Sequence, residues 1–163
     1  MNMKKGQIKL SFGMMFSIIL IIFFIAFAFF AIQKFLGLGN TISIGKFVED
    51  FQLNVDKLWE GVKGSQESEY FLPKKIKLVC FVNLLEPEKG TYQNQDYYEV
   101  FDKYSPDNNL FFYPMDVGLN GIEIKHISIE EDNPTCFEVK NGKVKIGIEK
   151  DFGEALVSVT DFS

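Results

Sequence analysis

The clearest pattern in the sequence is a long run near the N-terminus that contains no charged residue. From Phe12 to Ile32 all 21 residues are apolar, Gly, Ala or Ser, and 14 of them are Phe, Ile or Leu. A helix of this length measures roughly 30 Å, the thickness of the hydrocarbon core of a bilayer. The large apolar side chains favour insertion by about 4 to 8 kcal/mol. The pattern predicts a transmembrane helix over residues 12–36, after a basic cytoplasmic head over residues 1–11.

Two other kinds of segment contain a similar run. A buried helix of a soluble protein seldom lacks a polar face for this long. A cleaved secretory signal also has a basic head, and Ala26, Phe27 and Ala28 have the small-residue pattern of a cleavage site. The chain continues with Phe29 and Phe30 rather than with polar residues, so we expect an anchor that stays in the membrane.

The spacing of apolar residues changes after the anchor. Residues 37–40, with two glycines and an asparagine, predict a short joint, and Thr41 or Ser43 could cap a new helix. Apolar residues then recur every three or four positions, which predicts an amphipathic helix over about residues 42–63. The stripe comprises Ile44, Phe47, Val48, Phe51, Val55, Leu58, Trp59 and Val62. We expect it to pack on its own domain, with Trp59 in the core, although a packing surface for a neighbouring subunit would have the same pattern.

The rest of the chain, residues 70–163, has the alternation typical of strands. Lys75–Val82, Leu110–Tyr113 and Ala155–Thr160 are predicted strands, and Gln93–Tyr104 is a short helix or a loop. The polar run 65–69 should form a loop after the helix. The fold class expected for the exposed part, residues 37–163, is therefore α+β, with a mainly antiparallel sheet on the second helix.

Two local features refine the predicted sheet. Asn141-Gly142 supplies the two positive φ values of a type I′ turn, which predicts a hairpin between the strands on either side. The alternation slips at Lys125 and His126, which indicates a bulge.

The two cysteines, Cys80 and Cys136, lie in predicted strands. In an oxidising extracellular space such a pair favours a disulfide over two buried thiols. The bond would close a loop of about 55 residues and stabilise the fold by about 4 kcal/mol.

Charge is distributed unevenly along the chain. Lys4, Lys5 and Lys9 precede the apolar run, whereas all 22 acidic residues lie at or beyond Glu49. Because basic residues stay on the cytoplasmic side, we expect a cytoplasmic N-terminus and an extracellular C-terminal domain in the cell membrane. From Asn40 onward the net charge is −9 and no arginine occurs, which argues against nucleic acid as a partner.

Candidate chemistry is sparse, so we expect neither an enzyme nor a cofactor. His126 is the only histidine, and no Cys-x-x-Cys pair suggests a metal site. The run Glu130, Glu131 and Asp132 could bind calcium but lacks the spacing of an EF-hand loop, so a solvated face is expected. An aromatic segment could line a sugar or peptide site but is more readily explained as core. Its residues are Tyr92, Tyr97, Tyr98, Tyr104, Phe111, Phe112 and Tyr113.

The head of the chain carries a resemblance to a known family. Lys4-Lys5-Gly6-Gln7, placed just before the apolar run, resembles the class III signal of archaeal type IV pilins and related surface-filament subunits. The resemblance implies that a prepilin-type peptidase cuts between Gly6 and Gln7 and leaves the helix as a lipid anchor or a filament core. Many members carry a Glu five positions into the mature chain, where this sequence has Ser11. The likeness covers about the first 35 residues.

Two functions are compatible with these features. The first is a membrane-anchored, pilin-like structural or surface protein that acts by assembly or adhesion. Its partners would be the lipid bilayer, the peptidase, and copies of itself or related subunits. The alternative is a monomeric membrane-tethered binding or accessory module that uses the aromatic segment as its contact surface, in which the basic head only sets topology.

Overall fold

The longest element of the protein is a helix that includes both predicted helices. The computed structural model describes residues 12–90, 97–101, 103–115, 117, 119, 121–130 and 132–161. Helix α1 is assigned to Phe12–Trp59. The chain divides into two units, Met1–Leu38 and Gly39–Ser163, and α1 contributes residues to each.

No break in the helix is assigned at the predicted joint, residues 37–40, although the boundary between the two units, at Leu38 and Gly39, falls inside it. A glycine weakens a helix by only about 1 kcal/mol relative to alanine, which long helical flanks can offset. Ser43 does not cap a new helix either. Its hydroxyl donates to the carbonyl of Gly39 at 3.0 Å, four residues earlier, which is a bond made inside a helix. The helix also ends earlier than predicted, at Trp59, and Gly61 N–H donates to the carbonyl of Leu58 at 3.1 Å.

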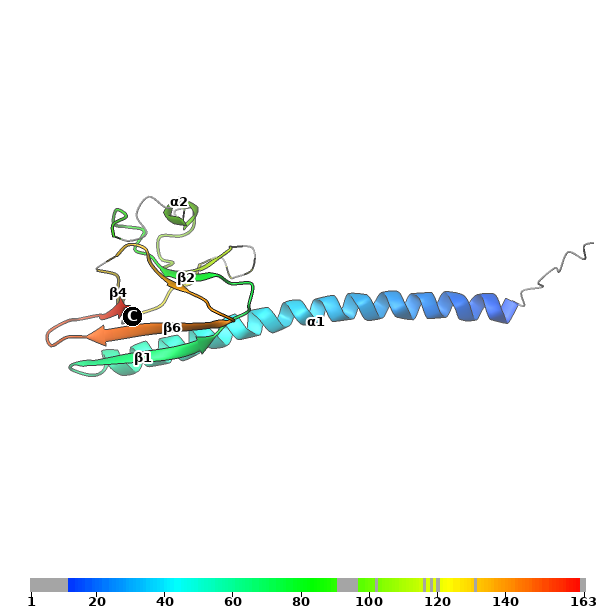
Figure 1. Ribbon diagram of the computed structural model, residues 1–163, viewed down its shortest axis with the longest axis horizontal. Coiled ribbons are helices and arrows are strands. Elements are labelled where there is room, and N and C mark those ends of the chain that lie inside the picture. Colours follow the sequence, from blue (N-terminus) through cyan, green and yellow to red (C-terminus); the bar gives the residue numbers. More distant parts are fainter. Residues whose placement is uncertain are drawn as a thin grey trace, which may run out of the picture. The chain divides into compact units, whose positions relative to one another are not determined.

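Among the described residues, the second unit adds a short helix and seven strands, which form two sheets (Figure 1). The elements are β1 (Gly64–Phe71), β2 (Leu78–Phe81), α2 (Tyr97–Phe101), β3 (Leu110–Tyr113), β4 (Ile127–Ser128), β5 (Thr135–Glu138), β6 (Lys143–Lys150) and β7 (Val157–Thr160). The first sheet has the order β1-β6-β7-β4, and only the β4–β7 pair is parallel. The second sheet, β3-β2-β5, is antiparallel. The protein is therefore α+β, as predicted.

Strand β1 corrects the expectation of a loop at the polar run 65–69. It is the edge strand of the first sheet and pairs with β6 over its whole length. An edge strand with one solvated face needs few apolar residues, and charged side chains on it are common. Glu69 pairs with Lys143 of β6 at 2.8 Å, and Tyr70 contributes the buried side chain. Sequence alternation alone could not separate such a strand from a polar loop.

The turn at Asn141-Gly142 is confirmed, but its two strands belong to different sheets. Asn141 and Gly142 have φ values of 55° and 78°, and Lys140 and Lys143 exchange two backbone hydrogen bonds of 2.8 and 3.0 Å. Beyond this closure β5 pairs with β2, and β6 pairs with β1 and β7. The turn therefore passes the chain from one sheet to the other.

The predicted bulge at Lys125 and His126 is instead a turn. Like the turn at Asn141-Gly142, it passes the chain from one sheet to the other. His126 adopts a positive φ of 65°. Before the turn, Ile122 bridges to Leu110 of β3, and after it, β4 pairs with β7. The slip in alternation therefore marks a second change of sheet rather than an extra residue within one strand.

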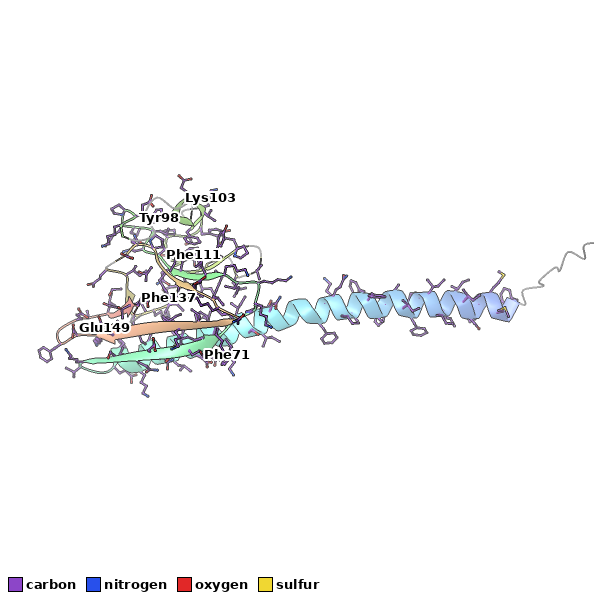
Figure 2. All side chains as sticks on the ribbon, viewed as in Figure 1. Phe71, Tyr98, Lys103, Phe111, Phe137 and Glu149 are labelled. Carbon is purple, nitrogen blue, oxygen red and sulfur yellow. A yellow bond between two sulfur atoms is a disulfide. The ribbon has the colours of Figure 1, made fainter. Side chains whose placement is uncertain are left out.

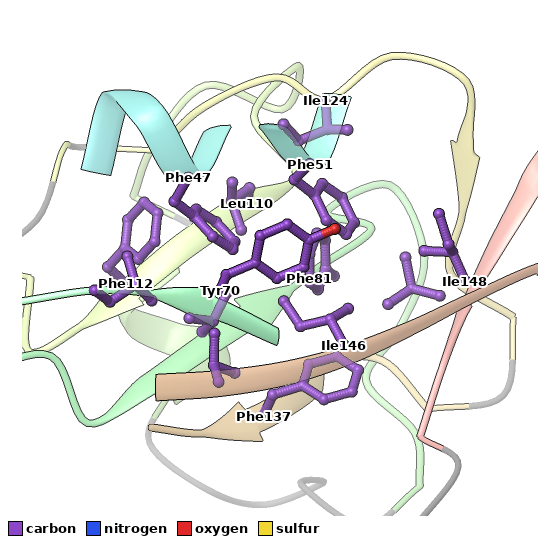
Figure 3. Packing of buried hydrophobic residues seen from close by; sticks show 14 of the residues in the cluster. Phe47, Phe51, Tyr70, Phe81, Leu110, Phe112, Ile124, Phe137, Ile146 and Ile148 are labelled. Carbon is purple, nitrogen blue, oxygen red and sulfur yellow. The ribbon is translucent and has the colours of Figure 1, made fainter. Parts of the chain in front are cut away.

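Two hydrophobic clusters lie on opposite faces of the second sheet. The larger one contains the buried stripe of α1, and Figure 3 shows Phe47 and Phe51 packed among aromatic residues of the strands. The ring centroids of Phe51 and Phe81 are 5.0 Å apart, and those of Phe47 and Phe112 are 5.7 Å apart. The smaller cluster comprises Cys80, Val82, Phe101, Phe111 and Cys136. The second sheet is thus buried on both faces, which explains its unbroken apolar runs.

Candidate membrane anchor and surface features of the folded unit

The candidate anchor is the apolar part of α1 in the first unit. From Phe12 to Phe35 every side chain is exposed except Ala31, which is half-buried. Phe23 and Phe24 are 64% and 63% exposed, so large aromatic rings project from all sides of the helix (Figure 2). By length and composition this helix could cross a membrane.

Two of the few polar side chains of this stretch, Ser17 and Lys34, have partners within the helix. The hydroxyl of Ser17 donates to the carbonyl of Gly13 at 2.9 Å. Lys34, the first charged residue after the apolar run, places its Nζ 5.6 Å from the centroid of the Phe30 ring. A helix satisfies its own backbone groups, which hydrocarbon requires. The stretch is therefore chemically suited to a lipid environment.

The predicted processing site, Gly6 and Gln7, lies outside the described residues, as do Lys4 and Lys5. The class III resemblance remains a prediction from the sequence. The first described residue, Phe12, is already helical.

Cys80 and Cys136 lie directly opposite each other on β2 and β5 and are joined by a disulfide. Both residues are buried, and they belong to the same cluster as Phe101 and Phe111. Such burial keeps solvent and thiols away from the sulfur atoms. The bond therefore fits a structural cross-link rather than a redox site.

The sequence analysis missed a contact that joins His126 to the end of α1. His126 Nδ1 lies 3.0 Å from a carboxylate oxygen of Asp56, and the ring stacks on Trp59 with centroids 3.8 Å apart. The indole N–H of Trp59 donates to the carbonyl of Ala155 at 2.9 Å. Trp59 is 38% exposed, so its predicted place in the core is wrong. Because indole and carboxylate together hold the imidazole, the contact fixes the turn at Lys125–His126 structurally.

The acidic run 130–132 is next to a buried asparagine that also escaped prediction. Asn133 is completely buried. Its Nδ2 donates to the carbonyls of Asn83 and Glu86 at 2.8 and 3.2 Å, and its Oδ1 accepts from the Asn83 N–H at 2.9 Å. Glu131 lies outside the described residues, and among those described no group of His, Cys, Asp and Glu could hold a metal ion. The segment therefore holds the loop after β2 in place through hydrogen bonds. The sequence does not predict this role, because an isolated Asn-Pro pair forms no periodic pattern.

Most described members of the aromatic segment belong to the core. Phe111 and Phe112 are completely buried, and Figure 2 shows Phe111 inside the folded unit. The Tyr98 hydroxyl donates to the carbonyl of Glu86 at 2.6 Å. Tyr113 is 36% exposed, whereas Tyr92 and the side chain of Tyr97 are outside the described set. A contact surface built on Phe111 and Phe112 is therefore excluded.

A cleft of about 330 Å³ opens beside β4. Polar side chains line much of it, with Glu86, Asp107 and Glu130 as its acidic members. The amide of Asn109, also in the lining, exchanges hydrogen bonds of 2.8 and 2.7 Å with the backbone of Ile124. The cleft could accept a small polar or cationic ligand.

Comparison of the chain with protein-family models, curated protein sequences and solved structures gives no match. The functional interpretation therefore depends on the exposed apolar stretch of α1, the folded second unit and the residues of the head.

Proposed function

We propose that this chain is a membrane-anchored, pilin-like surface protein. Its span is the apolar part of α1, and its second unit, Gly39–Ser163, lies outside the cell. The observation that supports the anchor is the exposure of large apolar side chains on all sides of α1 from Phe12 to Phe35. In water such a surface is unfavourable, whereas each Phe, Ile or Leu at the centre of a bilayer favours insertion by about 0.3 to 0.6 kcal/mol.

The orientation follows from charge. Lys4, Lys5 and Lys9 precede the span, and the residues from Asn40 onward carry a net charge of −9. Basic residues near a span are retained on the cytoplasmic side. The acidic second unit is then the part that is translocated.

Two features support the pilin-like part of the proposal. The first is the Lys4–Gln7 head, which resembles a class III signal. The second is that one helix, α1, supplies both the apolar stretch and the stripe packed in the core of the second unit. After cleavage the apolar stretch would act as a lipid anchor or pack against other subunits, and the second unit would act by assembly or adhesion.

The test is the intact mass of the protein recovered from membranes of its own host. A chain that begins at Gln7 supports the pilin-like function, and a Gly6→Val variant, with a branched side chain at the cut, should then stay unprocessed. A chain that begins at Met1 or Asn2 contradicts the pilin-like function and leaves a plain anchor. A chain that begins at Phe29 contradicts the anchor itself.

The cleft beside β4 favours a second candidate, a monomeric tethered binding module for a small polar or cationic ligand. The two functions differ in oligomeric state. Cross-linking in native membranes should give ladders of subunits for the first and a single band for the second.

A further inference from the structure

The second unit has two distinct ends along the β1–β6 pair. The pair runs in register from Gly64 opposite Lys150 to Phe71 opposite Lys143. At one end of the pair, the ring centroids of Phe47 and Tyr70 are 5.1 Å apart. At the other end, Leu58, near the end of α1, lies beside Gly64. Phe71 and Lys143 are therefore at the end where α1 enters the unit, and Figure 1 shows β1 beside the α1 residues of this unit.

This entry end assembles lysines from separate segments. Lys77 N–H donates to the carbonyl of Tyr113 at 2.7 Å, and the carbonyl of Lys77 accepts from Val139 N–H at 2.8 Å. Lys74 lies beside the Asn141-Gly142 turn, with its Cγ 3.4 Å from the position a Cβ would take on Gly142. We define the entry surface as Phe71, Lys74, Lys75, Lys77, Tyr113, Lys140 and Lys143, all of them exposed.

The entry surface is basic although the unit as a whole is acidic. Residues 71–77 and 139–143 contain five lysines and no Asp or Glu, against a net charge of −9 from Asn40 onward. Lys140 and Lys143 are paired with Glu138 and Glu69 at 3.1 and 2.8 Å. Within the described part of the chain, Lys74, Lys75 and Lys77 have no ion pair. The surface therefore keeps at least three uncompensated positive charges.

The opposite end of the same unit has the other sign. Glu149, Asp151 and Glu154 lie there, and Lys63 pairs with Asp151 at 2.6 Å. Lys150 is buried, with its Nζ bonded to the carbonyls of Trp59 and Gly61. Of the two ends, only the one where α1 enters is therefore basic.

Aromatic groups accompany these lysines. Phe71 is 66% exposed, and the Nζ of Lys143 lies 5.2 Å from the centroid of its ring. Tyr113 is 36% exposed at the same end. Aromatic rings among lysines are typical of surfaces at the boundary between lipid and water, where rings enter the headgroup layer and lysine amines stay hydrated.

The chain itself limits how far this end can be from the apolar run. Gly39, where the second unit begins, is only seven positions after Ile32, the last residue of that run, so seven Cα–Cα steps join the two. Even fully extended they reach only about 25 Å. We propose that the entry surface docks on anionic lipid headgroups of the membrane that holds the anchor. This inference depends on the proposed anchoring of α1.

Docking of this kind depends on lipid charge and on salt. Lysines close to an anionic surface are attracted to it, and the attraction decays within a Debye length. The lysines of the entry surface should therefore be shielded by anionic lipid at low salt and released at high salt.

The test is lysine footprinting of the full chain in lipid nanodiscs. The discs contain phosphatidylcholine alone or mixed with phosphatidylglycerol, and acylation of each lysine by an amine-reactive ester is followed by mass spectrometry. With the anionic lipid, we expect Lys74, Lys75 and Lys77 to be acylated at about one third of the rate seen with phosphatidylcholine alone, or more slowly still. At about 0.5 M NaCl, where the Debye length is roughly 4 Å, the difference should disappear. Lys57, Lys103 and Lys125, exposed elsewhere on the unit, should react equally in both discs.

A matched pair of triple variants extends the test. Replacing Lys74, Lys75 and Lys77 with Gln should abolish the lipid-dependent protection of Lys140, whereas the same change at Lys57, Lys103 and Lys125 removes equal charge and should preserve it. Equal acylation of the entry lysines in both discs overturns the proposal. So does protection that follows protein concentration instead of lipid charge, which would indicate the acidic end of a second copy. A chain that does not enter the discs contradicts the proposed anchor as well, so the two failures are distinguishable.

Discussion

Helix α1 contains two stretches whose side chains have opposite environments. Between Phe12 and Ile32 nearly every side chain is exposed, and large apolar residues lie on all sides of the helix. Between Ile44 and Val55 one buried stripe is formed by Ile44, Phe47, Phe51 and Val55, and the exposed residues include Lys46, Glu49 and Asp50. The secondary structure is the same, so helix formation alone tells nothing about function.

The difference lies in what each stretch needs from its surroundings. The stripe of the second stretch is satisfied by the strands, because Phe51 contacts Phe81 and Tyr70 within the same unit. The large apolar side chains of the first stretch are exposed instead, which suits a nonaqueous environment. Mutations should therefore have separable effects in the two stretches.

The largest expected effect comes from charge in the middle of the first stretch. The double variant Ile21→Lys with Ile25→Lys should lose membrane integration. Each lysine at the centre of a span costs about 2.5 to 3.5 kcal/mol, so two cancel the estimated gain of about 4 to 8 kcal/mol. Alkaline carbonate extraction should release the variant from the membrane pellet.

The matched control for this change is Ile42→Lys with Leu53→Lys. These residues of the second unit are 69% and 60% exposed, so the control should stay in the pellet. If the double lysine variant in the first stretch also remains there, the first stretch is not the anchor.

The next largest effect is expected in the second stretch. Phe51→Ala leaves a cavity among Phe47, Tyr70 and Phe81 and should lower the free energy of unfolding of the second unit by about 3 to 5 kcal/mol. Phe24→Ala, in the first stretch, should leave it unchanged. Guanidinium unfolding in detergent, followed by Trp59 fluorescence, measures both. Similar losses for the two variants would show that the stretches are not energetically separate.

A smaller effect is expected at the C-terminal end of the second stretch. His126→Ala removes the contacts with Asp56 and Trp59 and should cost about 1 to 2 kcal/mol. His126→Asn should cost less, because asparagine tolerates a positive φ and keeps a hydrogen-bonding group. Unfolding midpoints give the ranking, and equal costs for the two variants would exclude a role for the backbone conformation.

The smallest effect concerns how the free energy of unfolding of the second unit depends on pH through Tyr70, which packs against the stripe. Burial raises the pKa of Tyr70 above its ordinary value, while a hydrogen bond from Asn54 opposes the shift. Above pH 10 the unfolded chain therefore releases this proton more readily than the folded one, so stability should fall as pH rises. Tyr70→Phe should flatten this part of the profile of unfolding free energy against pH, and an unchanged slope would contradict the assignment.

The features predicted correctly from the sequence depend on neighbours along the chain. The apolar run, the spacing of Phe47, Phe51 and Val55, and the Asn141-Gly142 turn are all local patterns. The features that were missed depend on distant segments. Strand β1 is recognisable only by its partner β6, and Trp59 finds His126 across 67 positions of sequence.

The basic entry surface was hidden for the same reason. Its lysines come from two separate segments, 71–77 and 139–143, and the net charge of −9 from Asn40 onward masks them. The pairing of Phe71 with Lys143 and of Lys77 with Val139 brings these segments together. The candidate anchor could therefore be predicted from the sequence, whereas the charged end of the folded unit could not.

The disulfide between Cys80 and Cys136 also determines how the protein would respond to tension. Under the proposed function, the chain would be pulled between its anchor and whatever its second unit adheres to. The bond joins residues 56 positions apart, so an unravelling chain would be denied roughly 190 Å of contour length. The second unit could therefore extend only through its segments before Cys80 and after Cys136, while the loop between them would stay closed.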